Sequence, residues 1–141
     1  MGKSDEDVGS VNGIINSAFH LAAFKLGLND SEMSIFYVIS RCGEGCNQSE
    51  LYKRTGQRRS TINSAIRKME RENLLYLEPG DGRNTKVFLT EKGRRRSRET
   101  VGRLLQIEES IVKEWDENER RQFIDLTSRF FSQLREEIEK L

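Results

Sequence analysis

Apolar residues recur every three or four positions along most of this chain, which is the spacing of helices that bury one face. The stripe is sharpest in residues 57–73, where it consists of Ile62, Ala65, Ile66 and Met69. The same period predicts further helices over residues 8–26, 29–41, 47–55 and 117–141, and one helix that begins after Thr90 and continues to Trp115. The chain is therefore expected to be mainly helical.

Two short strands are predicted at residues 74–78 and 86–89, because the turn-forming segment 79–85 separates them. Upstream, a short helix, a turn at Gly56 and the helix over 57–73 have the order of a helix-turn-helix. The hairpin that follows would be the wing of a winged helix. The predicted fold class is mainly α with a small β-wing, in which a winged helix-turn-helix is joined to a helical lobe made by the N- and C-terminal helices.

Side chains that can cap helices mark several of the predicted ends. An Asn or Asp followed three residues later by Glu has the spacing of a capping box. This spacing occurs in the pairs Asn29–Glu32, Asn47–Glu50 and Asp116–Glu119. Asn73 is expected to take the left-handed conformation that ends a helix.

The 141 residues carry a net charge of only +1, but this charge is segregated along the chain. Residues 47–98 hold 14 Lys and Arg against 6 Asp and Glu, a balance of +8, whereas residues 1–46 and 99–141 have balances of −3 and −4. A basic centre between acidic flanks is typical of a module that binds a polyanion such as double-stranded DNA. With 35% hydrophobic and 33% charged residues, the chain has the composition of one helical, highly charged domain.

The terminal helices carry more apolar surface than a small winged helix can cover. The first has a wide apolar stripe, and the last carries Phe123, Ile124, Leu126, Phe130, Phe131, Leu134, Ile138 and Leu141. We expect both ends of the chain to form a two-fold homodimer. The chain 1–141 would then be a single domain, with a DNA-binding lobe over 29–98 and a helical dimerisation lobe over 8–28 and 99–141.

The polar side of the helix over 57–73 suits a DNA groove, because phosphates attract cations and base edges need hydrogen-bonding partners. The candidate contacts there are Arg58, Arg59, Ser60, Thr61, Asn63, Ser64, Arg67 and Lys68. On the predicted wing, Arg83 would enter a minor groove, with Asn84 and Lys86 beside it. For this helix taken alone, a solvated surface face is an equal alternative, and the charge segregation favours DNA.

Three arginines, Arg94, Arg95 and Arg96, lie in the first turns of the helix after Thr90. The helix dipole favours anions rather than cations at that end. Phosphate contact beside the wing would explain the departure. The alternative is that these arginines are solvated or pair with Glu99 and its neighbours.

Other classes of protein find little support in the sequence. No apolar run is long enough to span a membrane, and the N-terminus MGKSDEDVGS lacks the apolar stretch of a signal peptide. Two Cys without a secretory signal indicate a cytoplasmic protein. His20 and these Cys form no metal pattern, so His20 is interpreted as an interface or pocket-edge residue. No catalytic set or cofactor motif is visible, and we expect no enzymatic activity.

The chain resembles the MarR family of bacterial transcription regulators over nearly its whole length. The most specific part is residues 81–93, DGRNTKVFLTEKG, which is similar to the family's wing signature of Asp-x-Arg followed by Val-x-Leu-Thr-x-x-Gly. Residues 48–51 and 59–62 match its helix-turn-helix. The resemblance implies a homodimer that binds a pseudo-palindromic operator, usually as a repressor, and a ligand pocket between its lobes. It also implies that Asp81 steadies Arg83.

One departure from the family concerns the position before the reading helix. That position is often Ser in the family and is Arg58 here. This change weakens the usual N-cap and adds a candidate phosphate or base contact, so the operator sequence cannot be carried over. A rival interpretation of the whole chain is a winged helix that docks a protein partner and never touches DNA.

A small molecule or an oxidant could release such a regulator from DNA. A pocket for a small-molecule effector could use Phe19, Phe24, Phe36 or Trp115, although aromatic residues at helical spacing are more often core. Cys42 continues an apolar face and is expected to be buried, whereas Cys46 in a Gly-rich segment is the expected exposed thiol. Both are candidate redox residues, and their spacing alone does not establish a disulfide.

Overall fold

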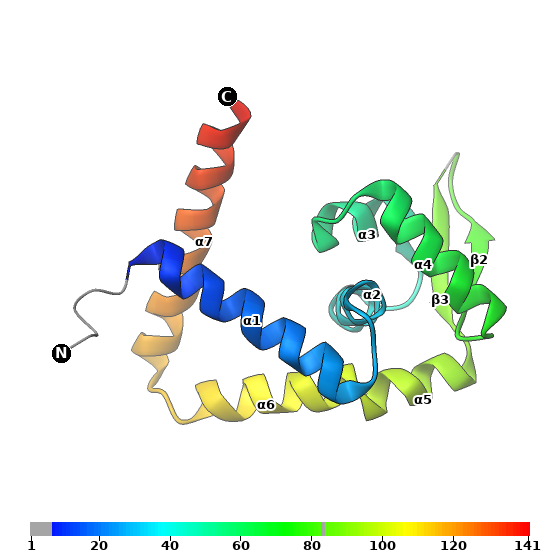
Figure 1. Cartoon of the computed structure of the whole chain (residues 1–141), viewed down its shortest axis with the longest axis horizontal. Coiled ribbons are helices and arrows are strands. Elements are labelled where there is room, and N and C mark those ends of the chain that lie inside the picture. Colours follow the sequence, from blue (N-terminus) through cyan, green and yellow to red (C-terminus); the bar gives the residue numbers. More distant parts are fainter. Residues whose placement is uncertain (1–6, 83) are drawn as a thin grey trace. The chain divides into compact units, whose positions relative to one another are not determined.

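The computed structural model describes residues 7–82 and 84–141. Its elements in chain order are α1 (Val8–Leu26), α2 (Asp30–Cys42), β1 (Cys46–Asn47), α3 (Gln48–Thr55), α4 (Arg59–Arg71), β2 (Leu75–Pro79), β3 (Thr85–Leu89), α5 (Glu91–Glu99), α6 (Val101–Lys113) and α7 (Glu117–Glu139) (Figure 1). The predicted fold class, mainly α with a small β-wing, is confirmed. The chain divides into two compact units, Met1–Leu104 and Leu105–Leu141. The lobe boundaries expected from the sequence remain a prediction.

The first unit is built around one hydrophobic core that α2, α3, α4 and the sheet share. Its largest fully buried side chains include Ile35 and Phe36 of α2, Leu51 of α3 and Val87 of β3. Helix α4 adds the whole stripe expected from the sequence, Ile62, Ala65, Ile66 and Met69. Figure 1 shows α4 beside the β2–β3 hairpin, which it contacts through β2. The core therefore ties the helix-turn-helix and the wing into one body.

The wing is an antiparallel hairpin with a third strand at its side. β2 pairs with β3 in a register that sets Leu75 opposite Leu89, so the two strands expected from the sequence are confirmed. β1 pairs with the other side of β3, where Cys46 lies opposite Val87, and the strand order is β1-β3-β2. The sequence did not predict β1, because a strand of two residues has no periodicity to detect.

The capping predictions are confirmed at two of the three helix starts. Asn29 and Asp116 form capping boxes, in which each side chain accepts from the backbone N–H of the Glu three residues later and that Glu accepts in return. Asn47 is the N-cap residue of α3, but its side chain makes no capping hydrogen bond, so a capping box there was wrong. Asn47 is also a strand residue of β1, whose partner is Lys86.

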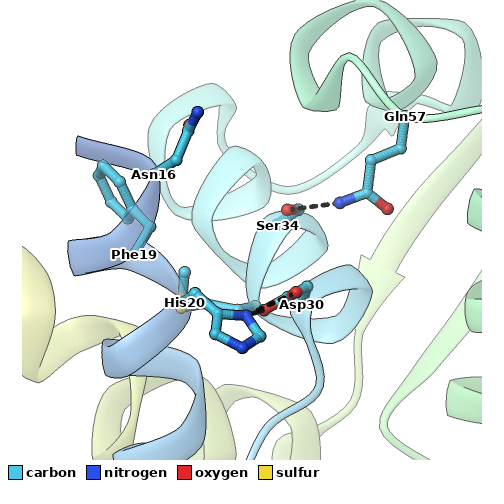
Figure 2. Close-up of a pocket in the computed structure, with 7 residues that line it drawn as sticks. Asn16, Phe19, His20, Asp30, Ser34 and Gln57 are labelled. Atoms are coloured by element: carbon cyan, nitrogen blue, oxygen red, sulfur yellow. Dashed lines mark hydrogen bonds and ion pairs between the residues drawn. The ribbon is translucent and has the colours of Figure 1, made fainter. Parts of the chain in front are cut away.

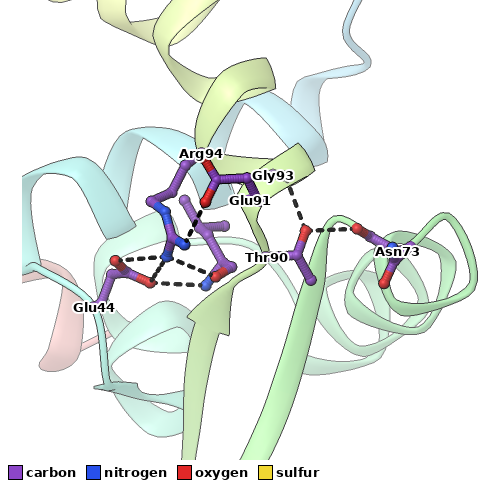
Figure 3. Close-up of polar contacts among 7 residues, drawn as sticks. Glu44, Asn73, Thr90, Glu91, Gly93 and Arg94 are labelled. Carbon is purple, nitrogen blue, oxygen red and sulfur yellow. Dashed lines mark hydrogen bonds and ion pairs between the residues drawn. The ribbon is translucent and has the colours of Figure 1, made fainter.

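The connection from α4 to the wing and the start of α5 meet at Asn73. Asn73 has a φ of 60°, which confirms the left-handed conformation expected for it. Its carbonyl oxygen accepts a hydrogen bond from the Thr90 hydroxyl (2.6 Å), which in turn accepts from the Gly93 N–H (3.0 Å). Figure 3 shows this chain of contacts. One hydroxyl therefore caps α5 and fastens it to the end of α4.

The single helix predicted between Thr90 and Trp115 was wrong, because the structure divides it at Thr100 into α5 and α6. Thr100 is buried and has non-helical angles, φ −119° and ψ −88°. Its hydroxyl donates to the carbonyl oxygen of Arg96 at 2.7 Å. A Thr hydroxyl that takes a helix carbonyl competes with the helix's own hydrogen bonds and bends it. The apolar period continues across the bend, so the sequence pattern did not reveal it.

The second unit contains the end of α6, a turn and α7. The Arg120 guanidinium donates to the carbonyl oxygens of Val112 (3.0 Å) and Trp115 (2.7 Å), and so satisfies the C-terminal end of α6. The rings of Trp115 and Phe123 meet edge to face, with centroids 5.3 Å apart. None of the residues of α7 is buried in this chain. Within the described ranges, we find no helix with the length and hydropathy of a membrane span.

Gly93 generates a first prediction, because a Cβ at this position would overlap the backbone carbonyl of Leu74. We expect Gly93→Ala to lower the free energy of unfolding by about 1–3 kcal/mol, the usual cost of overpacking. Urea denaturation followed by circular dichroism measures the change. Gly102→Ala is the control, since its Cβ would make an ordinary contact of 3.4 Å with the Ser97 carbonyl oxygen. Equal stability of the Gly93→Ala variant and the parent would contradict this packing.

Candidate nucleic-acid interface

The exposed side of α4 brings most of the predicted DNA-contacting residues onto one surface. The buried stripe faces the core, and the side chains left outside are Arg58, Arg59, Ser60, Thr61, Ser64, Arg67 and Lys68. We call these seven residues the reading face. It carries four cations and three hydroxyl groups, and the first turn of α4 has no acidic residue. Cations suit phosphates, and hydroxyl groups suit either phosphates or base edges.

Helix α4 begins without a capping side chain of its own. Arg58 is the N-cap residue, and its side chain makes no capping hydrogen bond, as its replacement of the usual Ser predicted. The residue before it, Gln57, is held by α2 instead. Its amide oxygen accepts from the Ser31 hydroxyl (3.0 Å), and its amide nitrogen donates to the Ser34 hydroxyl (3.1 Å). We call this arrangement of Ser31, Ser34 and Gln57 the Gln57 clasp.

Two residues of α3, Gln48 and Tyr52, contact the reading helix and were not singled out as site residues from the sequence. Both donate hydrogen bonds to Oδ1 of Asn63, which is half-buried on α4. The Tyr52 ring also lies under the Arg59 guanidinium, 4.6 Å from its centroid. A spacing of four residues places Gln48 and Tyr52 on one side of α3, and this was the only signal the sequence offered.

The wing places two further predicted residues at the surface. Asn84 lies at the tip of the hairpin and Lys86 on β3, opposite Glu78 of β2, and both side chains are exposed. Asp81 is also exposed, and its carbonyl oxygen accepts from the Asn84 N–H at 3.2 Å. Arg83, the residue expected to enter a minor groove, lies outside the described residues. The roles of Asp81 and Arg83 therefore stay predictions.

The three arginines after Thr90 have different surroundings. Arg94 pairs with Glu44 and Glu91, each at 3.2 Å, and donates to the Leu89 carbonyl oxygen (Figure 3). Arg96 donates to the Gly27 carbonyl oxygen at the end of α1 (3.0 Å). Arg95 is exposed. Arg94 therefore pairs with carboxylates, but with Glu44 and Glu91 rather than with Glu99 and its neighbours. Phosphate contact remains a prediction, which Arg95 fits best.

The burial expected for the two cysteines was wrong, because Cys46 is buried and Cys42 is exposed. Cys46 belongs to β1 and lies opposite the fully buried Val87, whereas Cys42 is the last residue of α2. Both are free thiols. Burial raises the pKa of the Cys46 thiol, and the Cys42 thiol raises it further.

A cavity of about 390 Å³ lies between α1, α2 and Gln57 of the turn that joins α3 to α4 (Figure 2). Its lining residues are Asn16, Phe19, His20, Asp30, Met33, Ser34 and Gln57. His20 hydrogen-bonds to Asp30 through Nδ1 at 3.0 Å, and the bond between Gln57 and Ser34 forms part of the wall. Of the aromatic residues considered from the sequence, only Phe19 lines this cavity. Across the described parts of the chain, no three His, Cys, Asp or Glu side chains gather as metal ligands.

Comparison with known proteins gives a family match and several structural likenesses. Residues 26–84 match the model of the MarR family. The MepR–DNA complex of Staphylococcus aureus is 19% identical, with a TM-score of 0.73 over 91% of this chain and 96% of that chain. PcaV of Streptomyces coelicolor with its natural ligand is 22% identical, with a TM-score of 0.67 over 91% and 94%. A MarR family regulator from Neisseria meningitidis is 16% identical, with a TM-score of 0.78 over 100% of both chains. Curated proteins give no match.

These likenesses extend over at least 91% of the chain and define it as a winged helix-turn-helix protein. The match over residues 26–84 covers α2 to the tip of the wing, and so includes the helix-turn-helix and the first residues, 81–84, of the wing signature. Over residues 26–84 the chain is similar to the MarR family, and the solved structures of that family share its winged-helix fold.

The uncapped start of α4 generates a second prediction. Arg58→Ser supplies a hydroxyl that can accept from the first free N–H groups of α4, so we expect the free energy of unfolding to rise by about 0.5–2 kcal/mol. Arg58→Ala is the matched control, because it removes the same cation without adding a cap. Thermal and urea denaturation of the two variants measure the difference. If both variants are equally stable, the start of α4 does not lack a cap.

Proposed function

We propose that the protein is a sequence-specific DNA-binding repressor that acts as a homodimer on a pseudo-palindromic operator in the cytoplasm. The observation that carries this proposal is the reading face. Its four cations and three hydroxyl groups are exposed at the surface of α4 and its N-cap, whereas the apolar stripe on the other side of the helix is buried in the core. The DNA complex of the S. aureus relative supports such a role. Arg83, Asn84 and Lys86 would contact the flanking minor groove.

The proposed homodimer rests on apolar side chains that the single chain leaves exposed at both ends. On α1, Ile14 is 58% and Phe24 79% exposed. On α7, Phe123, Ile124 and Phe130 are exposed, together with the other large apolar residues of that helix. Apolar patches of this extent mark association surfaces. A two-fold pair would present two reading faces to successive major grooves of one duplex.

A third prediction concerns the salt dependence of DNA binding. The protein should select a palindromic site from a randomised duplex library, and the logarithm of its affinity should fall linearly with the logarithm of the KCl concentration. Replacing Arg67 and Lys68 together by Ala should lower the magnitude of the slope by the equivalent of about four phosphate contacts, two for each chain of the proposed homodimer. Fluorescence anisotropy measures the affinities, and sedimentation of the complex gives the number of chains per duplex.

Lys140→Ala is the control for this experiment, because it removes an exposed cation from the C-terminal end of α7, away from the reading helix in sequence. Its slope should equal that of the parent. A flat salt dependence would overturn the DNA-binding proposal and favour the rival one, a winged helix that docks a protein partner. One chain per duplex would contradict the proposed homodimer.

We further propose that the cavity beside α4 binds a small-molecule effector that releases the protein from DNA. The cavity shares Ser34 and Gln57 with the Gln57 clasp, which holds the chain just before the N-cap residue of the reading helix. A ligand that hydrogen-bonds to either residue competes with the clasp and displaces the start of α4. The lining residues suit a compact molecule with an apolar body beside Phe19 and a polar group beside His20. The ligand complex of the S. coelicolor relative supports an effector.

A fourth prediction tests this cavity with a panel of compact molecules that combine an aromatic or aliphatic body with a polar group. A molecule that binds the folded parent raises its melting temperature. The same molecule should not raise the melting temperature of His20→Ala, but it should still raise that of Asn12→Ala, because Asn12 does not line the cavity. Ser31→Ala should keep ligand binding, since Ser31 does not line the cavity, but should alter DNA release. A thermal shift that persists in His20→Ala would place the effector elsewhere.

An oxidant is the second candidate signal, and one observation favours it. The exposed Cys42 lies four residues before the buried Cys46, which pairs with the wing strand β3. Oxidation at this pair would disturb the end of β1 beside the wing. The cavity remains the stronger candidate, because its wall includes Gln57, which leads into the reading helix.

A further inference from the structure

The side-chain oxygen of Asn63 is fully occupied by residues of α3. The Tyr52 hydroxyl donates to Oδ1 of Asn63, and so does the Gln48 amide nitrogen, at 3.1 Å. An amide oxygen has two lone pairs, so these two bonds use its whole acceptor capacity. Gln48 is one turn from Tyr52 on the same side of α3, which explains why both reach one atom.

Asn63 nevertheless lies beside the reading face. It is four residues after Arg59 and four before Arg67, and residues at this spacing are neighbours on a helix surface. Its side chain is half-buried rather than enclosed. Among the described residues, its side-chain hydrogen bonds are those made by Oδ1, so the two N–H donors of Nδ2 are left for a partner in the groove.

This arrangement restricts what Asn63 can recognise. In the usual bidentate contact with adenine, an Asn donates to N7 and accepts from the N6 amino group through its Oδ1. We propose that Tyr52 and Gln48 are specificity-determining positioning residues, which make Asn63 a donor only and thereby exclude the bidentate adenine contact. Asn63 then reads acceptors such as O6 and N7 of guanine or O4 of thymine. This inference rests on the proposed DNA binding.

Tyr52 also positions a second DNA-contacting candidate, Arg59, through its aromatic ring. The Arg59 guanidinium lies over the Tyr52 ring, 4.6 Å from the centroid, in the geometry of a cation–π contact. The hydroxyl thus sets the donor character of Asn63, and the ring sets the place of Arg59. The two roles can be separated, because Tyr52→Phe keeps the ring and removes only the hydroxyl.

The fifth prediction compares the base preferences of the parent and of the double variant Tyr52→Phe with Gln48→Ala, each selected against the same randomised duplex library. The position read by Asn63 is the one whose preference disappears in Asn63→Ala. At that position the parent should not favour adenine. The double variant frees Oδ1 and should gain a preference for adenine over guanine of about tenfold, within the range expected for one bidentate contact. If the double variant does not fold, Tyr52→Phe alone is judged by the same criterion.

Two further variants show whether the change is one of specificity. Ser49→Ala, at an exposed position of α3, should leave both affinity and base preference unchanged. Tyr52→Leu, which removes ring and hydroxyl, should weaken binding to every sequence as well, because Arg59 loses its support. If the double variant still binds DNA with an unchanged base preference, this inference is overturned and the proposed function is not. The same holds if the double variant loses the same amount of affinity for all sequences. Absence of salt-dependent DNA binding by the parent would overturn the proposed function together with it.

Discussion

Burial of one stripe of α4 is the constraint on which the rest of the winged helix depends. Ile62, Ile66 and Met69 are at most 1% exposed, and they meet the core side chains of α2, α3 and the sheet. This fixes the rotation of the helix about its own axis. A shift by one residue, about 100° in an α-helix, would turn cations of the reading face toward the core, where an unpaired charge is costly. The direction of the polar side chains thus follows from the packing of the apolar ones.

Features encoded by neighbours in the sequence could be predicted, and features that depend on distant partners could not. Three local patterns in the sequence are present in the structure: the apolar stripe of α4, the wing hairpin and the capping box at Asn29. The bend at Thr100 arises from competition between a hydroxyl and helix hydrogen bonds, which hydrophobic periodicity does not register. The burial of Cys46 depends on β1, which exists only because β3, some forty residues later, offers it a partner.

The candidate site shows the same division. Helical periodicity alone placed the reading face on one side of α4, although its part in DNA binding is still a proposal. The contacts that orient its residues were out of reach, since Tyr52 and Asn63 are eleven residues apart in the chain and belong to different helices. Arg94 and Arg96 looked alike in the sequence. In the structure one pairs with carboxylates near the wing, and the other binds the end of α1.

The Gln57 clasp has a consequence for how this fold can be recombined. Because α4 has no capping side chain and Gln57, two residues before it, is held by hydrogen bonds to α2, the reading helix is not a self-contained part. A chimera that receives only the helix-turn-helix from this chain would lose both hydroxyl partners of Gln57. The smallest portable segment therefore begins upstream, at the capping box of Asn29, and carries Ser31 and Ser34 with it.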